Sequence, residues 1–350
     1  MAEVVGAHLV GSAPVEEPEQ LFRLVGAHLG RHVRRIPDGE VGERDTWIRW
    51  QYPRLGQCPQ LEAAVIDTGY LGRELAQYAI KGGAGPIELV DLGYADAALE
   101  SWERFRRAKE EQTIGAEVRF LVGLPSPLSV VTMYVAPQAR PAVLEAWLAA
   151  MEQQLERIVD GIPNDELAVQ WEVCIEFGIL EGLWTLLDTG LSGDEARPGI
   201  GPHLVHLGDL VPEPVELGYH LCYGDSGHQH FTEPSDTGNL AWAASTALTG
   251  VRRPVQWIHL PVPRDRNDAA YFEPFRDVAL PVETELYLGL VHETGGEEAT
   301  RRRIEAASSV LPRFGVATEC GMGRRPLSSM GPLLDQHANV SDPIRSEGVN

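Results

Sequence analysis

Lysine is almost absent from this chain of 350 residues, in which Lys81 and Lys109 are the only two. Chemistry that depends on a lysine, such as Schiff-base catalysis or a Walker-type phosphate loop, is therefore poorly supported. A GxGxxG motif is also missing after the first predicted strand, which argues against a dinucleotide site of the Rossmann type. The N-terminal segment lacks a basic region, and its apolar run is too short to span a membrane.

Basic residues are in deficit as well, since 51 acidic side chains outnumber 29 basic ones and give a formal net charge of −22 at pH 7. A chain this negative repels nucleic acid and anionic lipid, and no basic block in the sequence offsets the repulsion. We therefore expect neither a nucleic acid nor a membrane as a partner.

Cysteine is scarce and widely spaced, at Cys58, Cys174, Cys222 and Cys320. This spacing differs from the dense disulfide framework of a small secreted domain. We expect a cytoplasmic protein whose thiols are reduced and free to bind a metal. Cys58 and Cys174 are assigned to structural roles.

Short β-branched runs alternate with amphipathic segments along the chain. The predicted strands are residues 4–10, 32–36, 117–122, 168–172, 216–222, 255–260, 286–291 and 315–318. The main predicted helices are residues 16–29, 96–112, 140–159, 236–248 and 297–310, with Asp96 and Asp236 as N-caps. Eight strands that alternate with helices indicate an α/β fold, a single (β/α)8 TIM barrel, with an open doubly wound sheet as the competing architecture.

Two segments interrupt the alternation and are expected as insertions. Residues 51–93 follow the second strand, and residues 190–208 form a loop-rich insertion after the fourth. The barrel is expected to occupy residues 1–336 as one domain, followed by a polar, frayed tail over residues 337–350.

Polar and sulfur-containing side chains lie at the ends of most predicted strands. In a (β/α)8 barrel the chemistry takes place at the carboxyl ends of the strands, so these residues are expected to converge on one face. They are Ser12, Glu40, Glu172, His220, Cys222, His259, His292 and Cys320.

The segment HLCYGD contains a histidine and a cysteine two residues apart, His220 and Cys222. On a strand their side chains share one face, and zinc prefers imidazole nitrogen and thiolate sulfur. Cys320 ends the last strand and can reach the same point in a closed barrel. The competing interpretation makes this pair ordinary core residues, Cys320 an inert buried thiol, and His259 a hydrogen-bonded core histidine.

Two carboxyl groups and one further histidine complete the candidate set. Glu40 and Glu172 suit a substrate ammonium or guanidinium group, although a salt bridge with Arg35 or Arg44 is the alternative. His292 is a candidate proton donor because imidazole titrates near neutral pH, and a loop-capping histidine is its alternative role.

At these residues the chain resembles the C-terminal catalytic barrel of cobalamin-independent methionine synthase, within the wider uroporphyrinogen-decarboxylase-like superfamily. The resemblance runs from about Val5 to Arg325 and keeps the order of the family's segments. The matching segments are VGSAP, DGE-x-GER, GLPSPLSV, VQWEV, HLCYGD, QWIHLP, LVH and ECGMGRR.

The resemblance implies roles for individual residues. His220, Cys222 and Cys320 correspond to zinc ligands, whereas the family's glutamate ligand is replaced by His259. Glu40 and Glu172 correspond to the residues that hold the amino group of homocysteine. Ser12 matches the serine of the first strand loop, and His292 matches the histidine proposed to protonate the leaving group.

These roles imply a zinc-dependent transferase that moves a methyl or other alkyl group onto a zinc-activated, homocysteine-like thiol. Folate is not expected as the donor, because the additional N-terminal barrel of folate-using members is missing and the chain repels polyanions. A neutral His259 ligand in place of a glutamate would give a less nucleophilic thiolate, which suits a more reactive donor. Such donors are a sulfonium, an epoxide, or a cobalt-bound methyl group that a methyl-carrier protein delivers.

Other functions remain open from the sequence. One is a zinc enzyme that opens an epoxide with a small thiol, and another is a metal-free, decarboxylase-like barrel. A third is a non-catalytic binding protein, since a fold does not guarantee activity. The sequence leaves the alkyl donor, the acceptor thiol and the oligomeric state undetermined.

Overall fold

A curled parallel sheet forms the centre of the molecule in the computed structural model, which describes residues 2–64, 76–227 and 229–345. Each of the eight predicted strands overlaps one of its strands. In chain order these are β1 (Glu3–His8), β2 (Arg35–Pro37), β5 (Arg119–Pro125), β6 (Leu167–Val173), β7 (Glu216–Leu221), β8 (Trp257–Pro261), β9 (Glu285–Gly289) and β10 (Arg313–Ala317).

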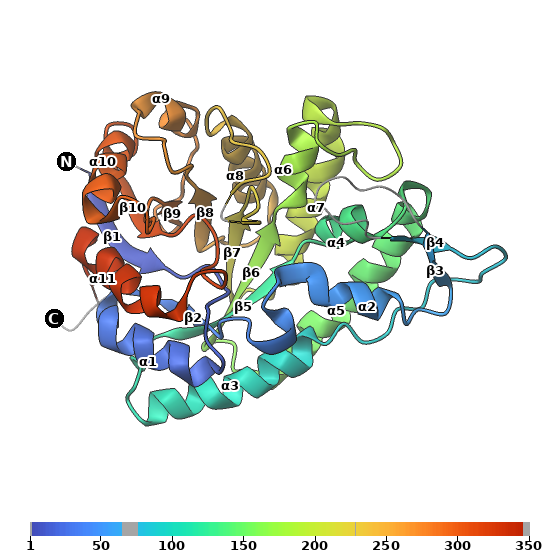
Figure 1. The fold of residues 1–350 in the computed structure, drawn as a ribbon, viewed down its shortest axis with the longest axis horizontal. Coiled ribbons are helices and arrows are strands. Elements are labelled where there is room, and N and C mark those ends of the chain that lie inside the picture. Colours follow the sequence, from blue (N-terminus) through green and yellow to red (C-terminus); the bar gives the residue numbers. More distant parts are fainter. Residues whose placement is uncertain (1, 65–75, 228, 346–350) are drawn as a thin grey trace.

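The strand order is β1-β10-β9-β8-β7-β6-β5-β2, and all neighbours are parallel. The first strand therefore pairs with the last. Beyond the ends of β1 and β2, a parallel bridge joins Ser12 to Gly39, and the Ala13 N–H donates to the Gly39 carbonyl at 2.9 Å. The curled sheet is thus consistent with a (β/α)8 barrel, and its strands follow one another without the switch point of a doubly wound sheet (Figure 1).

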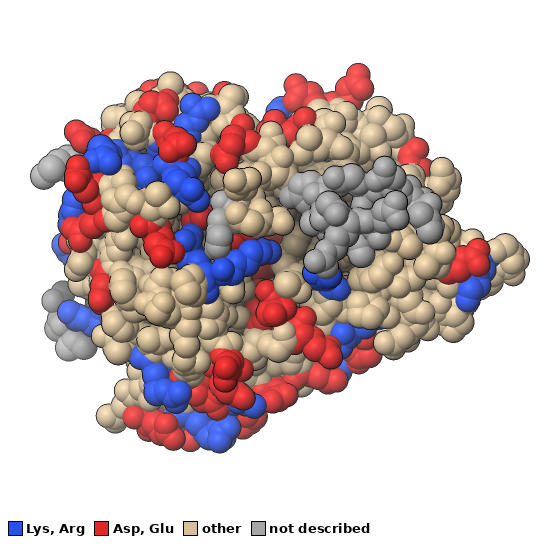
Figure 2. Space-filling view, in the orientation of Figure 1, with Lys and Arg blue, Asp and Glu red and all other residues tan. Residues whose placement is uncertain are grey.

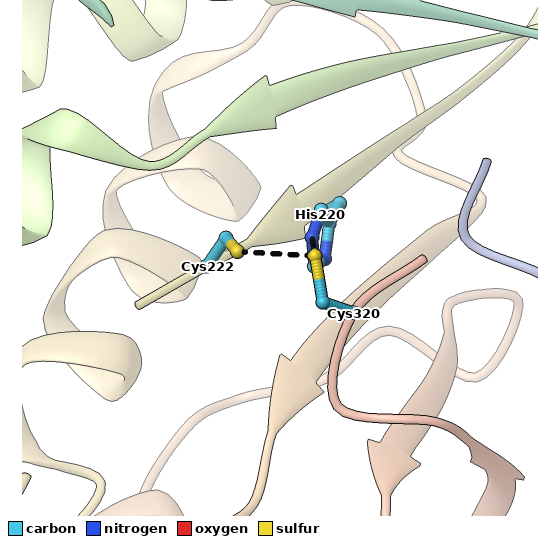
Figure 3. Close-up of side chains that lie close together, drawn as sticks. All are labelled: His220, Cys222 and Cys320. Atoms are coloured by element: carbon cyan, nitrogen blue, oxygen red, sulfur yellow. Dashed lines mark hydrogen bonds between the residues drawn. The ribbon is translucent and has the colours of Figure 1, made fainter. Parts of the chain in front are cut away.

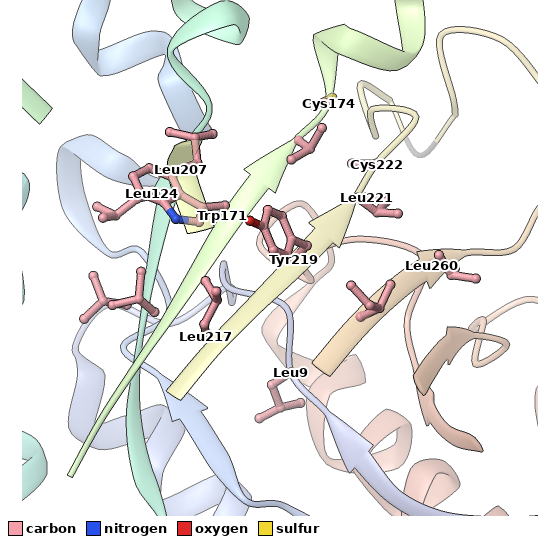
Figure 4. Close-up of a cluster of buried hydrophobic side chains, with 14 of the residues drawn as sticks. Leu9, Leu124, Trp171, Cys174, Leu207, Leu217, Tyr219, Leu221, Cys222 and Leu260 are labelled. Carbon is pink, nitrogen blue, oxygen red and sulfur yellow. The ribbon is translucent and has the colours of Figure 1, made fainter. Parts of the chain in front are cut away.

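Two apolar layers hold the sheet. Every residue of β6 is buried, as expected for a parallel strand that is covered on both faces. Trp171 and Tyr219 point from the sheet toward its helices, where the Tyr219 hydroxyl donates to the Leu204 carbonyl at 2.8 Å (Figure 4). A second cluster includes Trp257 and Tyr287 and lies on neighbouring strands.

The helices observed are α1 (Pro18–His28), α2 (Gln51–Leu55), α3 (Tyr94–Glu110), α4 (Pro127–Tyr134), α5 (Arg140–Gly161), α6 (Ile175–Leu180), α7 (Arg197–Leu210), α8 (Gly238–Gly250), α9 (Ala269–Phe272), α10 (Gly296–Ser308) and α11 (Met330–Val340). The five main predicted helices overlap α1, α3, α5, α8 and α10. In the segment 51–93, α2 precedes an antiparallel hairpin of β3 (Leu61–Ala64) and β4 (Gln77–Ile80), which projects from one side of the molecule (Figure 1). Residues 65–75 of this predicted insertion lie outside the described residues.

The second predicted insertion is wrong in one respect, because most of residues 190–208 belong to helix α7. Its glycines and prolines suggested a loop, yet Pro198 lies in the first turn, where a helix needs no N–H donor. The close contact with α8 depends on Gly250, where an added β-carbon would lie 2.3 Å from Val205 of α7, so a small residue there permits close helix packing.

Neither predicted N-cap is the observed one, since Gly93 is the N-cap of α3 and Thr237 is the N-cap of α8. Asp96 lies within the first turn of α3, where it pairs with Arg157. Asp236 precedes the N-cap of α8, and its carboxylate accepts the Gly238 N–H at 2.7 Å. In each case the acidic group still lies near the positive end of the helix.

The expected start of the tail, residue 337, falls inside α11. His337 and Val340 are buried, and the Asp342 N–H donates to the Val4 carbonyl at 2.8 Å. The segment looked polar in sequence, but its few buried side chains share one helix face. Residues 346–350 lie outside the described residues. Among the helices that the structure describes, none combines the length and apolar character that crossing a bilayer requires.

Candidate metal centre and adjoining pockets

Three predicted ligand residues meet at the carboxyl ends of the strands. His220 lies near the end of β7, Cys222 directly follows that strand, and Cys320 follows β10. Two strands, β8 and β9, separate β7 from β10 in the sheet. The end of β7 and the segments that follow β7 and β10 nevertheless bring the three side chains together, as Figure 3 shows.

The distances fit a tetrahedral zinc site. Cys222 Sγ lies 3.6 Å from Cys320 Sγ, and Cys320 Sγ lies 3.7 Å from His220 Nε2. The three ligand atoms all lie within 4.8 Å of one another. Usual zinc bond lengths and tetrahedral angles would separate two sulfurs by about 3.8 Å and a sulfur from a nitrogen by about 3.6 Å. These residues therefore fit zinc by donor type and by spacing.

Hydrogen bonds between the cysteines, together with burial, control the protonation of this cluster. The pKa of Cys222 is raised well above its ordinary value, mainly by a hydrogen bond with Cys174. The pKa of Cys320 is raised in the same way by its hydrogen bond with Cys222 and then by burial. Burial also lowers the pKa of His220 well below its usual range. Without a cation the thiols and the imidazole are therefore neutral, whereas a divalent cation would favour the thiolates.

His259, also predicted as a ligand, lies behind His220 and is not brought into the three-residue cluster. It is 0% exposed, and burial lowers its pKa to about 3. Its Nδ1 lies 2.7 Å from Nδ1 of His220, and its Nε2 lies 3.0 Å from the carbonyl oxygen of Thr318. Both of its ring nitrogens are thus already engaged.

Cys174 lies beside the cluster, although the sequence analysis assigned it to structure. It follows the end of β6, pairs with Cys222 through a side-chain hydrogen bond, and lines the same pocket (Figure 4). The sequence did contain one indication of this position. Cys174 and Cys222 directly follow β6 and β7, and residues just past the ends of two neighbouring parallel strands lie side by side.

The pocket next to the cluster contains the predicted substrate residues. Ser12, Glu40 and Glu172 line it together with all three candidate ligands. Ser12 also holds the loop that carries Cys320, because its carbonyl accepts the Met322 N–H at 2.7 Å and its Oγ accepts the Gly323 N–H at 3.3 Å.

Glu40 and Glu172 place their carboxyl groups side by side. A β-carbon added at Gly11 would lie 2.7 Å from Oε1 of Glu40 and 3.5 Å from Oε1 of Glu172, so both groups converge over this glycine. Burial raises the pKa of Glu40 well above its ordinary value, and the charge of Glu172 raises it further. Burial also raises the pKa of Glu172 to about 7. The pair therefore retains a proton at neutral pH.

The salt bridges considered as alternatives for this pair are not formed. Arg35 pairs with Glu216 and Glu285, and Arg44 pairs with Asp38. Instead, the indole N–H of Trp47 donates to Glu172. Trp47 was missed in the sequence, because it begins a short 3-10 helix (Trp47–Trp50) that carries no recognisable motif.

His292 lies beside the cluster pocket rather than in it. It lines a neighbouring cavity that shares Asp225 with the cluster pocket. Its Nε2 lies 3.0 Å from the Val262 carbonyl oxygen, and its Nδ1 lies 3.2 Å from Oε2 of Glu319. Burial alone would raise the pKa of Glu319, but the hydrogen bond and charge of His292, with the charge of Arg325, lower it to about 2.

Comparison with known proteins gives a structural likeness only. No family model matches the sequence, and no curated protein matches it. A Listeria monocytogenes protein, provisionally described as a vitamin B12-independent methionine synthase, superposes with a TM-score of 0.58 at 14% identity, covering 98% of this chain and 99% of that one.

Two further solved structures are similar. A B12-independent methionine synthase from Shewanella sp. W3-18-1, in complex with selenomethionine, gives a TM-score of 0.53 at 12% identity and covers 82% of this chain and 76% of that one. A methyltransferase from Methanosarcina mazei gives a TM-score of 0.54 at 13% identity and covers 97% of this chain and 94% of that one. At these identities the likeness establishes the fold.

Proposed function

We propose that this chain is a zinc-dependent transferase that moves a methyl or other alkyl group onto the sulfur of an amino-acid thiol such as homocysteine. One observation carries the proposal: His220, Cys222 and Cys320 converge with zinc-like spacing in a pocket that also contains the Glu40–Glu172 pair. The likeness in fold to proteins described as methionine synthases and a methyltransferase supports it.

His220 Nε2 and the sulfurs of Cys222 and Cys320 would hold the metal. When bound, zinc would deprotonate a coordinating substrate thiol, so that the sulfur is a thiolate at neutral pH. A metal-free decarboxylase would have no need for these three side chains at one point.

The carboxyl pair would orient the substrate. Glu40 and Glu172 line the cluster pocket, and a substrate ammonium group would replace the proton that the pair retains. An anionic thiol, such as one with a sulfonate group, would instead be repelled. This contrast favours an amino-acid thiol over the substrate of a simple epoxide-opening enzyme.

The transfer itself forms one bond and breaks another. The thiolate sulfur bonds to the alkyl carbon, and the bond from that carbon to the donor atom breaks, leaving its electron pair on the donor. His292, which lines the neighbouring cavity, would protonate the departing atom where that atom needs a proton, after releasing its contact with Glu319 or with the Val262 carbonyl. Arg325 in turn holds Glu319 ionised through a 2.9 Å hydrogen bond.

We propose a donor other than a methylated folate, on grounds of charge alone, because His259 lies outside the three-residue cluster and no longer supports an argument from a neutral fourth ligand. The chain carries a net charge of −22, and on the face that Figure 2 shows, Lys and Arg lie in small groups among Asp and Glu. A polyglutamylated folate would be repelled by such a surface. With homocysteine as acceptor, we expect methionine from a methylsulfonium or from methylcobalamin, and none from methyltetrahydrofolate, as measured by mass spectrometry. Equal turnover with the folate would refute this choice of donor.

Metal content is the first test of the function. We expect one zinc per chain in the purified protein and its loss in Cys222→Ser, as measured by inductively coupled plasma mass spectrometry. Cys58→Ser is the matched control, because Cys58 is also buried but hydrogen-bonds Gln60 and does not contact the cluster. Zinc-free protein that still alkylates thiols would end the proposal.

A further inference from the structure

A chain of hydrogen bonds links one candidate ligand to the segment that carries another. It runs from the Thr318 carbonyl to Nε2 of His259 at 3.0 Å, and from Nδ1 of His259 to Nδ1 of His220 at 2.7 Å. Thr318 lies two residues before Cys320, and its Oγ1 donates to the Cys320 carbonyl at 2.6 Å. The chain therefore connects the His220 side of the cluster to the Cys320 side.

The direction of these bonds follows from one fixed acceptor. A backbone carbonyl can only accept, so Nε2 of His259 carries a hydrogen. Both imidazoles are buried, at 0% exposure for His259 and 2% for His220, and burial disfavours a charged ring. A neutral His259 then has a bare Nδ1, which must accept from Nδ1 of His220. The remaining nitrogen of His220, Nε2, is left with its lone pair, 3.7 Å from the Cys320 sulfur.

We propose that His259 is a positioning residue, which fixes the zinc-binding tautomer of His220 and leaves the fourth coordination position to the substrate thiol. This inference rests on the proposed function. As a fourth ligand, His259 would have to give up its bond to Thr318 or its bond to His220. As a positioning residue it keeps both.

The strand arrangement holds His259 in this role. His220 and His259 occupy paired positions on the neighbouring strands β7 and β8, so their rings face the same interior. The ring of His8 lies next to that of His259, and the two ring centroids are 5.8 Å apart. With three protein ligands, two of them thiolates, the site would leave a bound zinc without net charge. His220, Cys222 and Cys320 could then all remain ligands when the substrate thiol binds.

X-ray absorption at the zinc edge counts the ligands directly. We expect two sulfurs, one imidazole and one oxygen or nitrogen in wild type. The count should be the same in His259→Gln, because a glutamine amide can accept from Nδ1 of His220 and donate to the Thr318 carbonyl. His337→Gln is the matched control: His337 is equally buried, but it lies on α11 and hydrogen-bonds Leu333.

Zinc affinity provides the second measurement, by competition with a chromophoric chelator. His259→Ala should bind zinc about 10- to 100-fold more weakly, as is typical when the hydrogen-bond partner of a ligating histidine is removed. His259→Gln should recover most of this loss. Circular dichroism confirms folding, and the wild-type ligand count stands even if a variant fails to fold.

Two results would overturn the inference. One is a wild-type site with two imidazoles, of which His259→Gln loses one. The other is an unchanged affinity in folded His259→Ala. A wild-type protein without zinc would instead refute the proposed function and remove the basis of this inference with it, so the two failures are distinguishable.

Discussion

Two carboxyl groups share the buried pocket at Glu40 and Glu172, and their charge state decides what the pocket can bind. Burial raises the pKa of both, and the charge of Glu172 raises that of Glu40 further. The ionised pair is therefore unfavourable in the empty pocket and favourable only beside a cation. This electrostatic cost of ionising the pair is the physical reason to expect an ammonium group on the substrate.

The same electrostatic cost predicts that Glu172→Gln is more stable than wild type, by an amount that depends on pH. A carboxyl group whose pKa rises on folding contributes stability that is complete below its unfolded pKa, near 4.5, and is lost as pH rises through about 7. At pH 8 the variant should therefore exceed wild type by about 1–3 kcal/mol in free energy of unfolding. At pH 4.5 the difference should be much smaller. Urea unfolding at both pH values measures it.

The control for this prediction is Glu283→Gln, because Glu283 is exposed in a loop. Its effect should be small at both pH values. A Glu172→Gln variant that is less stable than wild type by the same amount at pH 4.5 and pH 8 would show that folding does not raise the pKa of Glu172.

At the scale of elements, glycines at strand ends make room for the carboxyl pair. A β-carbon at Gly11 would lie 2.7 Å from Glu40 Oε1, so Gly11→Ala should displace this carboxylate without altering the sheet. Misplacement by about 1 Å can reduce catalysis by up to about 100-fold, and we expect a loss of that order in kcat/KM for the thiol. Gly85→Ala is the control, because nothing lies within 4 Å of a β-carbon added there. Unchanged kinetics in Gly11→Ala would contradict the assigned role of Glu40.

The predictable elements were those with a clear pattern. All eight strands of the sheet were found, because β-branched runs bounded by turns mark buried parallel strands. Helix α7 was missed because prolines and glycines normally break helices, and this helix contains Pro202 in its interior as well as Pro198 in its first turn. The end of α11 was missed because few of its residues are apolar.

The site was predictable to the same degree. The positions of His220, Cys222 and Cys320 follow from their place at strand ends, since a curled parallel sheet brings these ends together. The place of His259 behind His220 does not follow, because the choice between ligand and hydrogen-bond partner depends on ring orientation. Likewise, the sequence does not show that the Glu319 carboxylate lies 3.2 Å from Nδ1 of His292.

At the scale of the whole molecule, the metal would tie distant parts of the chain together. Its proposed ligands come from the ends of β7 and β10, about 100 positions apart in sequence. A ligand that binds only the folded state, at 1,000 times its Kd, stabilises a protein by about 4 kcal/mol. Removal of zinc should then lower the Tm by roughly 5 °C for a chain of this size.

Differential scanning calorimetry with and without a chelator measures this shift. Cys222→Ser should show the lower Tm and no response to the chelator. Equal Tm values for wild type with and without the chelator would mean that no metal links β7 to β10.

The central claim is that a substrate thiol joins His220, Cys222 and Cys320 at one zinc ion. Zinc-edge X-ray absorption of the wild-type protein, recorded before and after addition of homocysteine, tests it most directly. The account predicts that the number of sulfur ligands rises from two to three while the single imidazole remains. A count that stays at two with homocysteine bound would contradict it.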